Sequence, residues 1–434
     1  MADEASTYPR GFTRETDWKW PMVPARKLVT LNYGRALKAD TRSRRKVPVF
    51  GTNGQCGWHD TALAKAPGLI LGRKGQGPLG VEWCDSDFWV IDTAYYASTL
   101  TPDVDLKYFY HVVNYIGLNH LKDGTSNPTL SRDTFGAQLF PLPPLAEQKS
   151  IASVLGALDD KIELNRRMNA TLESMARALF QSWFVDFDPV RAKLNDRHPV
   201  GMDAATAALF PDRFEDSSHG SVPRGWTYRP FGDVADINWG DTNTTKASYV
   251  QDGFTAYSAS GADGLLPGFD FDRTGVVVSA IGANAGVTWL AYGKWSCIKN
   301  TLRFWANASG LSTEFLFYST DGREKWPQRG SAQPFISEGD ARTMQILVPA
   351  NSLANRFGEC VRPWLARLKS NEIQSRTLAT LRDTLLPKLL SGELSVRVLL
   401  CFISARRAHD FMQQVGVRGS AVGSWRREVS ALVW

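Results

Sequence analysis

The sequence predicts an α+β protein with two β-rich α/β domains in tandem, each followed by a long helix, and the two helices pair with each other as a coiled coil. Three observations predict this class. An apolar seam with a period of 3.5 residues runs through residues 145–184. The seam recurs 206 positions later, and short β-branched and aromatic runs broken by glycine precede each copy. A helix with such a stripe needs a partner, and its own duplicate is available in the same chain.

The two seams consist of residues that follow one another in steps of three and four. In the first copy these are Ile151, Leu155, Leu158, Ile162, Asn165, Asn169, Leu172, Ala176 and Leu179. In the second copy they are Phe357, Val361, Trp364, Leu368, Asn371, Ser375, Leu378, Arg382 and Leu385. Both seams have a polar break at the same step, at Asn165 and Asn371, and a buried asparagine fixes register and pairing at some cost in stability.

The repeat extends through the regions that precede the helices, with a separation of 206 to 208 residues. The matched segments are 31–34 with 237–240, 50–54 with 257–261, 69–75 with 276–282, 106–110 with 313–317, 124–131 with 330–337, and 140–143 with 346–349. Most of these runs favour strands, and the segments that begin at Leu106 and Thr313 favour a short helix. Chance similarity does not hold register over such a distance, so the chain is a duplicated unit.

The repeat sets the domain boundaries. We predict a first domain at 1–143, a first spacer helix at 144–188, a connector at 189–221, a second domain at 222–349, a second spacer helix at 350–394 and an atypical tail at 395–434. The tail has no counterpart in the first half. We expect it to be poorly ordered or acquired, for example through a change of reading frame, and a native extra helix is the alternative.

Composition limits the classes of protein to consider. The chain has 434 residues, 43% hydrophobic and 22% charged, which suits a folded protein of two to four domains and excludes disorder as its main state. The net charge of +6 mildly favours a polyanionic partner. No apolar run approaches membrane-spanning length, and the N-terminus lacks a signal-peptide pattern. The five scattered cysteines predict neither disulfides nor a zinc site, and a reducing cytoplasm fits best.

Motifs for catalysis are missing from the sequence. It contains no phosphate-binding loop of the GxxxxGK[ST] type, no HExxH and no GxSxG. The six histidines show no spacing typical of metal ligands. We therefore predict a non-catalytic chain with no cofactor or metal of its own.

Polar and basic residues collect at equivalent loop positions of the two halves. In the first domain they are Arg42, Arg44, Arg45, Lys46, Asn53, Arg73, Lys74, Gln76, Lys122, Ser126 and Asn127. In the second they are Thr242, Asn243, Thr244, Lys246, Ser260, Asn284, Lys299, Arg329 and Gln333. Basic side chains neutralise phosphates, and amides and guanidiniums form paired hydrogen bonds with base edges. The halves share an apolar framework but differ in loop chemistry, as expected of one scaffold that reads two sequences. Ordinary solvated loops are the alternative for each residue alone.

Up to about Leu394 the chain resembles the specificity subunit of type I restriction-modification systems. The resemblance is carried by PLPPLAEQKSIASVLGALDDKIELNRRMNATLESMARALFQSWFVDFDPVRAK, by the turns GTSNPTLS and GSAQPFIS, by VPRGW, and by LRDTLLPKLLSGEL. It implies two target-recognition domains held apart by antiparallel helices, each reading one half of a split double-stranded DNA site. It also implies that methyltransferase (M) and restriction (R) subunits dock on this chain and hold the S-adenosylmethionine, ATP and Mg²⁺ chemistry.

The sequence departs from the family pattern in four places. The second seam includes Arg382, the second helix carries Pro363 and Pro387, the tail lies outside the pattern, and the loop after Trp239 lacks the Gly-Lys often found there. A spacer helix of about 38 residues is about 57 Å long, so we expect half-sites on the order of 10 base pairs or more apart.

Two other classes of function remain open at this point. One is a repeat-built scaffold or adaptor that binds proteins or carbohydrates, which would show no salt-dependent affinity for DNA. The other is a stand-alone nuclease or methylase, which S-adenosylmethionine binding by the purified chain would favour.

Overall fold

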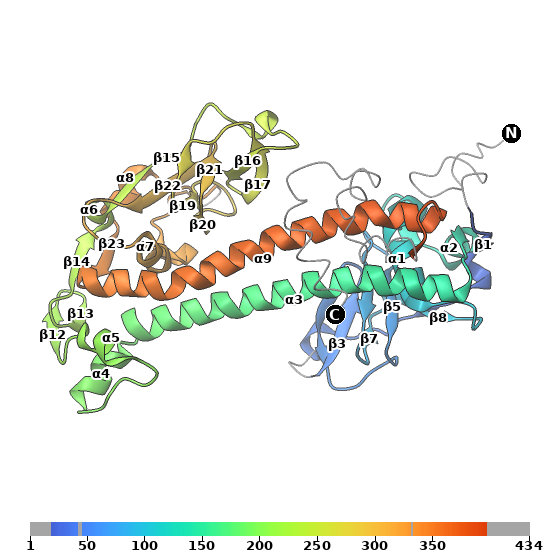
Figure 1. Ribbon diagram of the computed structural model, residues 1–434, viewed down its shortest axis with the longest axis horizontal. Coiled ribbons are helices and arrows are strands. Elements are labelled where there is room, and N and C mark those ends of the chain that lie inside the picture. Colours follow the sequence, from blue (N-terminus) through green and yellow to red (C-terminus); the bar gives the residue numbers. More distant parts are fainter. Residues whose placement is uncertain (1–18, 42–45, 331–332, 397–434) are drawn as a thin grey trace. The chain divides into compact units, whose positions relative to one another are not determined.

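The computed structural model describes residues 19–41, 46–330 and 333–396 (Figure 1). The chain forms two compact units, one from residues 1–166 and 372–434 and the other from residues 167–371. Each unit therefore combines one β-rich region with one half of each long helix. We call the β-rich regions the first head (residues 19–141) and the second head (residues 214–348). Most of the tail, residues 397–434, lies outside the described residues.

The first head contains two sheets. The main sheet has the order β2 (Val29–Tyr33), β8 (Ala94–Thr99), β5 (Gly68–Gly72), β6 (Val81–Cys84), and all its neighbouring strands are antiparallel. The second sheet has the order β4 (Gly54–His59), β3 (Val47–Gly51), β7 (Trp89–Val90), with β3 and β7 parallel. Two small ladders pair β1 (Met22–Pro24) with β11 (Leu139–Pro141) and β9 (Lys122–Asp123) with β10 (Thr129–Leu130). Its helices are α1 (Leu106–Ile116) and α2 (Arg132–Ala137).

The second head repeats this topology. Its main sheet has the order β15 (Ala235–Trp239), β22 (Thr301–Ala306), β19 (Gly275–Ser279), β20 (Thr288–Ala291). Its other sheet has the order β17 (Gly261–Leu266), β16 (Phe254–Ser258), β21 (Lys294–Cys297), β18 (Phe271–Asp272), and β14 (Thr227–Pro230) pairs with β23 (Gln345–Val348). Its helices are α6 (Phe231–Val234), α7 (Thr313–Thr320) and α8 (Glu338–Thr343). The register shifts at equivalent steps, Val49/Phe50 and Ala256/Tyr257, so the duplication extends to a backbone irregularity.

Each head has two hydrophobic cores because its central strand is buried on both faces. Successive side chains of a strand point to opposite faces of the sheet. In β5, Leu69 and Leu71 enter the core that also contains the long helices, whereas Ile70 enters a smaller core with Phe50 and Phe88. In β19, the side chains of residues 276–278 divide in the same way between a large and a small core. A continuous apolar run, instead of an alternating one, is the expected pattern for such a strand.

The long helices are α3 (Leu145–Phe184) and α9 (Asn351–Ser391), each about 60 Å in length. Within each unit they pair antiparallel. In the first unit Asp159 contacts Arg382 and Asn165 contacts Gln374, so residue numbers rise along one helix as they fall along the other. In the second unit the ring of Phe180 packs against Phe357, and Asn169 contacts Leu368, in the same sense. The predicted α+β class with antiparallel helices is confirmed.

The predicted seam departs from the observed burial in the second unit. In the first unit, five predicted apolar members are buried: Ile151, Leu155, Leu158, Leu378 and Leu385. In the second unit Leu172, Leu179, Trp364 and Leu368 are only half-buried. Phe180, Trp183 and Phe184 are buried there instead, in an aromatic cluster with Phe315 and Phe357. These aromatic side chains project from α3 at positions next to the 3.5-residue seam and contact the second head. Packing against the head therefore decides which helix residues are buried in the second unit.

The second long helix is continuous despite the prolines and the arginine that interrupt its apolar pattern. It runs unbroken through Pro363 and Pro387. Arg382, which interrupts the apolar seam, donates a hydrogen bond of 2.7 Å from Nη1 to Asp159 of α3. A charge in the seam is tolerated because the opposite charge faces it across the helix pair.

The predicted connector is more structured than its weak hydrophobic pattern suggests. It forms α4 (Asp188–Leu194), α5 (Ala204–Ala208) and a hairpin of β12 (Phe214–Ser217) with β13 (Gly220–Pro223), so the predicted boundary at residues 221 and 222 falls inside β13. Arg356 of α9 holds the start of α5 through hydrogen bonds to Thr206 (2.9 Å) and Asp203 (3.2 Å).

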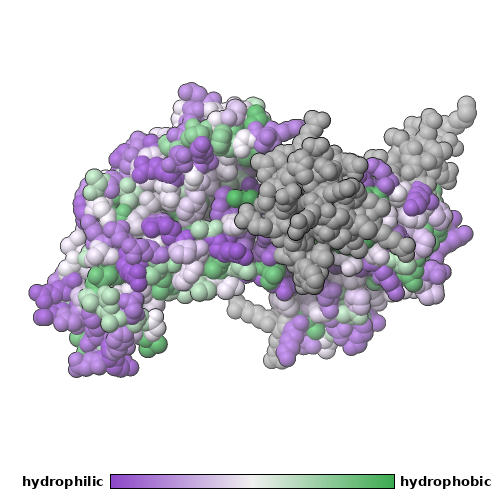
Figure 2. Space-filling model, viewed as in Figure 1, coloured by the Kyte–Doolittle hydropathy of each residue, from purple (hydrophilic) through white to green (hydrophobic). Residues whose placement is uncertain are grey.

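Figure 2 shows that hydrophilic residues cover most of the visible face, with hydrophobic residues scattered among them. Within the described ranges, the structure contains no helix that combines the length and the apolar character needed to cross a membrane.

Candidate nucleic-acid interface

Four loops of the first head are joined into one unit that we call the first loop cluster: residues 52–53, 73–77, 92–93 and 122–129. Thr52 connects three of the loops, because its hydroxyl donates hydrogen bonds to the carbonyls of Lys74 (2.8 Å) and Thr93 (2.9 Å). Backbone bonds add the fourth loop, from Gly75 N to Pro128 O at 3.0 Å and from Leu130 N to Arg73 O at 2.7 Å. The main sheet and this bonding hold the loops in fixed positions.

Four residues that the sequence singled out as DNA contacts are used inside this cluster. Lys122 donates to the carbonyl of Gly77 (3.0 Å), and Gln76 donates to that of Ser126 (2.7 Å). Arg73 donates from Nη1 to the carbonyl of Asp92 (3.0 Å), and Lys74 forms an ion pair of 3.0 Å with the Asp92 carboxylate. These four side chains shape the cluster, and each already makes at least one polar contact in the free protein.

The remaining described candidates of the first head are exposed. They are Lys46, Asn53, Ser126 and Asn127. Arg42, Arg44 and Arg45 lie outside the described residues. Asn53, Ser126 and Asn127 are therefore the residues of the first loop cluster whose side chains are open to a ligand.

The second head builds an equivalent second loop cluster from residues 241–246, 258–260, 280–287, 298–300, 329–330 and 333–334. The backbone bonds of the first cluster recur, from Gly282 N to Pro334 O (2.8 Å) and from Ile336 N to Ala280 O (2.8 Å). These atoms lie 206 or 207 positions after their counterparts in the first cluster. The framework is thus the same in both heads, while the side chains on it differ.

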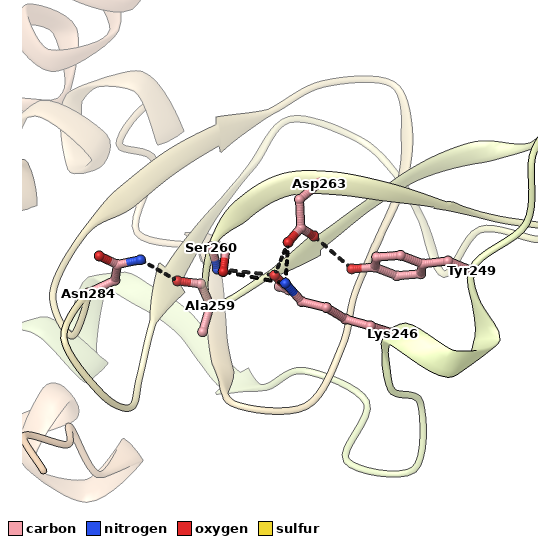
Figure 3. A network of polar contacts seen from close by, with 7 residues as sticks. Lys246, Tyr249, Ala259, Ser260, Asp263 and Asn284 are labelled. Atoms are coloured by element: carbon pink, nitrogen blue, oxygen red, sulfur yellow. Dashed lines mark hydrogen bonds and ion pairs between the residues drawn. The ribbon is translucent and has the colours of Figure 1, made fainter. Parts of the chain in front are cut away.

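Three residues of the second head that the sequence predicted as DNA contacts, Lys246, Ser260 and Asn284, lie in one polar network (Figure 3). Asp263 is its centre, since Lys246 Nζ (2.5 Å), Tyr249 OH (2.8 Å) and Ser258 Oγ (2.8 Å) all donate to its carboxylate. Burial alone would raise the pKa of Asp263, but these hydrogen bonds outweigh it and lower the pKa below its usual value. The Asp263 carboxylate is therefore charged and neutralises the charge of Lys246.

The two other predicted DNA contacts, Ser260 and Asn284, lie at the edge of the same network. The Ser260 hydroxyl lies 3.4 Å from Lys246 Nζ, and Asn284 donates to the carbonyl of Ala259 at 3.2 Å. Ser260 belongs to the short turn between β16 and β17, and Asn284 contacts the same turn at Ala259, as the close-up shows.

The other candidates of the second head divide into engaged and exposed groups. Asp241 accepts hydrogen bonds from the Thr244 hydroxyl and from Asn243 N, which lower its pKa. Arg329 pairs with Asp340. Thr242, Lys299 and Gln333 are exposed. Within the described part of the second head, Lys299 has no ion pair, in contrast to Lys246 and Arg329.

The polar break of the helix pair consists of hydrogen bonds between the helices. Asn165 Nδ2 donates to Gln374 Oε1 (2.7 Å) and to the Ser375 hydroxyl (3.2 Å). Asn371 Nδ2 donates to Asn169 Oδ1 (2.8 Å), and Asn169 Nδ2 donates to the carbonyl of Leu368 (3.2 Å). Both Asn165 and Asn371 are buried, so these bonds satisfy groups that have left water.

Sequence reasoning missed an aromatic and basic group beside the first loop cluster. Tyr33 ends β2 with a side chain exposed by 48%, and the guanidiniums of Arg132 and Arg73 lie 4.6 Å and 4.9 Å from its ring centroid. The repeat aligns Tyr33 with the exposed Trp239, and this match could have drawn attention to the position. Nothing in the linear pattern places Arg132 beside it.

The described residues contain no group of three or more His, Cys, Asp or Glu side chains that could hold a metal ion.

Comparison with known proteins gives consistent matches. Residues 81–174 match the family described as Type I restriction modification DNA specificity domain. The chain is 26% identical over 329 residues to the type I restriction enzyme HindI specificity subunit of Haemophilus influenzae, which covers 62% of this chain and 71% of that protein. It is 24% identical over 312 residues to the MjaIX specificity subunit of Methanocaldococcus jannaschii, which covers 65% and 66%. The crystal structure of a type I restriction-modification S subunit from M. genitalium shares the fold, with a TM-score of 0.56 at 16% identity over 88% of this chain and 98% of that one.

Proposed function

We propose that this chain, which is similar to the specificity subunits of type I restriction-modification systems, reads a two-part DNA target and brings methyltransferase and restriction subunits to that target. The observation that carries the proposal is the pair of loop clusters. Both heads hold their loops with the same backbone hydrogen bonds but place different side chains on them. One scaffold with two sets of side chains suits the reading of two unlike half-sites.

The chain carries no catalysis of its own in this proposal. Methyl transfer and cleavage belong to the M and R subunits, which would hold S-adenosylmethionine, ATP and Mg²⁺. The long helices are the surfaces we assign to these partners, because each follows one head in the sequence and they keep exposed apolar side chains such as Leu164 and Ile373 (51% and 54%). Double-stranded DNA is the ligand of the heads, and the cytoplasm is the proposed location.

The DNA contacts we propose are the exposed residues of the two loop clusters, with Arg and Lys on phosphates and amides on base edges. In the first head these are Lys46, Asn53, Ser126 and Asn127, with Arg42, Arg44 and Arg45 from the sequence alone. In the second head they are Thr242, Lys299 and Gln333, with Ser260 and Asn284 beside them. The engaged side chains Arg73, Lys74, Gln76, Lys122, Lys246 and Arg329, with Asn243 and Thr244, would support the loops or exchange partners on binding.

Methylome sequencing tests this function. The gene is expressed with its M partner in a host that lacks other adenine methylation, and methylated positions are mapped across the genome. We expect one motif of two short specified segments separated by an unspecified gap. Exchange of the second head for that of another specificity subunit should change only one segment. No methylated motif, together with DNA affinity that does not depend on salt, would instead support a scaffold that binds proteins or carbohydrates.

A further inference from the structure

Arg132 is the first residue of α2 and has an unusual environment for an arginine at that position. Its side chain is exposed, and among the described residues its guanidinium forms no hydrogen bond or ion pair. Its contact is with the ring of Tyr33, whose centroid lies 4.6 Å from the guanidinium carbon. A cation–π contact uses the electrons of the ring and occupies no conventional hydrogen-bond acceptor. The N–H donors of Arg132 therefore remain available.

Tyr33 packs against two side chains, Tyr95 and Arg73, that are fixed in the first head. Its ring lies 5.2 Å from that of Tyr95, which is its partner in the β2–β8 ladder, and 4.9 Å from the guanidinium of Arg73. Arg73 is itself fixed through Nη1 to the carbonyl of Asp92 and through its own carbonyl to Leu130 N. The Tyr33 ring thus contacts Arg73 of the first loop cluster, and the guanidinium of Arg132 contacts the same ring.

The second head has different chemistry at the same positions. The counterpart of α2 is α8, and both helices begin after a serine N-cap, Ser131 or Ser337. The residue after the cap is Arg132 in one and Glu338 in the other, and Glu338 pairs with Arg342 at 2.8 Å. A carboxylate suits the first turn of a helix and a cation does not. Helix stability therefore explains Glu338 but gives no reason for Arg132.

We propose that Arg132 binds a pair of acceptor oxygens or nitrogens on DNA in the half-site read by the first head, and that Tyr33 is the residue that positions it. This inference rests on the proposed function. Stacking on Tyr33 restricts a long side chain before DNA arrives, so less conformational entropy is lost on binding. The planar edge of the guanidinium matches either the O6 and N7 atoms of guanine or two phosphate oxygens. Because position 338 is acidic, the contact is specific to the first head.

The test uses the complex of this chain with its M subunits and fluorescence anisotropy on a duplex that carries the mapped target. Arg132→Gln should weaken binding about tenfold, within the range of a good bidentate contact. If the acceptor is guanine, the same variant should match the wild type on a duplex whose first half-site is scrambled. If the acceptor is guanine, discrimination is lost at one base pair only. If it is phosphate, all sequences weaken alike and the slope of log K against log salt falls by about 0.9.

Variants of Tyr33 test the positioning role. Tyr33→Phe keeps the ring face and should bind as the wild type does, whereas Tyr33→Leu should weaken binding about two- to fivefold, the range expected of an exposed cation–π contact. In the double variant with Arg132→Gln, the Tyr33→Leu effect should vanish, because the residue acts through Arg132. Glu338→Gln is the matched control in the second head, and it should leave recognition of the first half-site unchanged.

The outcomes separate this inference from the proposed function. If wild-type complex binds its target and Arg132→Gln binds equally well, with the same salt slope, the role of Arg132 is refuted while the function stands. If Tyr33→Phe and Tyr33→Leu behave alike, or if the Tyr33→Leu and Arg132→Gln effects add, the positioning role is refuted. If wild-type complex binds no DNA sequence, the proposed function itself fails. Thermal unfolding of each variant confirms that the exposed substitutions leave the fold intact.

Discussion

Asn371 of α9 donates a hydrogen bond of 2.8 Å to Asn169 of α3, and both residues lie in the second unit. In the first unit Asn165 of α3 donates a bond of 3.2 Å to Ser375 of α9. The two contacts are equivalent under the repeat, because Asn371 lies 206 positions after Asn165 and Ser375 lies 206 positions after Asn169. The duplication has therefore made a pair of equivalent polar contacts, and such contacts favour one antiparallel register over others.

We predict that Asn371→Leu destabilises the helix pair, whereas the double variant Asn169→Leu, Asn371→Leu does not. The single change removes a donor from Asn169 and should lower the free energy of unfolding by about 1 kcal/mol. Replacing both partners with apolar groups removes the polar mismatch and should restore that stability or exceed it. Urea unfolding at fixed protein concentration measures both values.

The control is Ser370→Leu, which adds a leucine at an exposed position next to the contact. It should change stability by less than about 0.5 kcal/mol. Equal losses in the single and double variants would show that the polar contact does not matter to the pairing. We also expect the double variant to populate misaligned or oligomeric states, visible by light scattering after size exclusion.

A second prediction concerns the ion pair between Arg362 of α9 and Glu314 of α7. The Glu314 side chain is only 4% exposed, and Arg362 Nε and Nη2 approach its two carboxylate oxygens at 3.0 Å and 3.4 Å. Arg362→Met should destabilise the second unit by about 1–3 kcal/mol, because it leaves a buried carboxylate without its cation. The half-exposed arginine keeps this below the cost of breaking a fully buried pair.

Adding Glu314→Gln to Arg362→Met should recover much of the loss, since the amide carries no charge. Arg213→Met is the matched control, because the Arg213–Asp212 pair is exposed on both sides and should contribute little. If Arg362→Met is as mild as Arg213→Met in urea unfolding, the link between α7 and α9 is not electrostatic.

A third prediction concerns pH. Burial lowers the pKa of His111 to about 3, and the nearby positive charges of Lys107 and Arg382 act in the same direction. Asp159 lies 3.7 Å from His111 Nδ1, beyond hydrogen-bonding distance, and its charge is paired with Arg382 at 2.7 Å. In the unfolded chain His111 takes up a proton near pH 6.5. The unfolded state therefore binds more protons between about pH 6.5 and pH 3, and stability falls as pH falls through this window.

The loss due to one such group amounts to at most about 1.4 kcal/mol per pH unit. We expect His111→Gln to lose less stability than the wild type between pH 7 and pH 5, as measured by urea unfolding at each pH. Parallel pH dependence of the two proteins would contradict a buried neutral histidine.

A fourth prediction follows from the ion pair of Lys74 with Asp92. Asp92→Asn removes the carboxylate that neutralises Lys74, so DNA affinity should rise several-fold and the salt slope should steepen by up to about 0.9. Lys74→Gln should change neither quantity much if Lys74 stays paired on binding, and should lower both if it turns to DNA. Stability should change by less than about 1 kcal/mol in both variants, because the pair is partly exposed.

Asp87→Asn is the control for this experiment. Asp87 forms an ion pair of 2.7 Å with the exposed Lys65 in the same head but outside the first loop cluster. Its replacement should leave DNA affinity as it is. If Asp87→Asn and Asp92→Asn raise affinity equally, the effect is one of net charge and not of the loop cluster.

Local and periodic features of the fold could be predicted from the sequence. The apolar run of β5 required burial on both faces, and the seam through Ile151, Leu155 and Leu158 required a partner helix. The 206-residue repeat supplied that partner, and the same strand order in both heads agrees with it. The aromatic packing around Phe180 could not be predicted in this way, because it depends on which side of the helix the second head covers.

What the sequence by itself determined is the doubling of one unit, its two helices and the positions of the loops that differ, since these depend on spacing and residue type along the chain. Only the tertiary structure decided which charges are neutralised. Lys74 pairs with Asp92, Lys246 with Asp263 and Arg382 with Asp159, and the partners are 18, 17 and 223 positions apart in the sequence. Only the folded chain brings Arg132 onto Tyr33. The physical reason is that Coulomb and cation–π interactions act over a few ångströms of space, and sequence separation does not measure that distance.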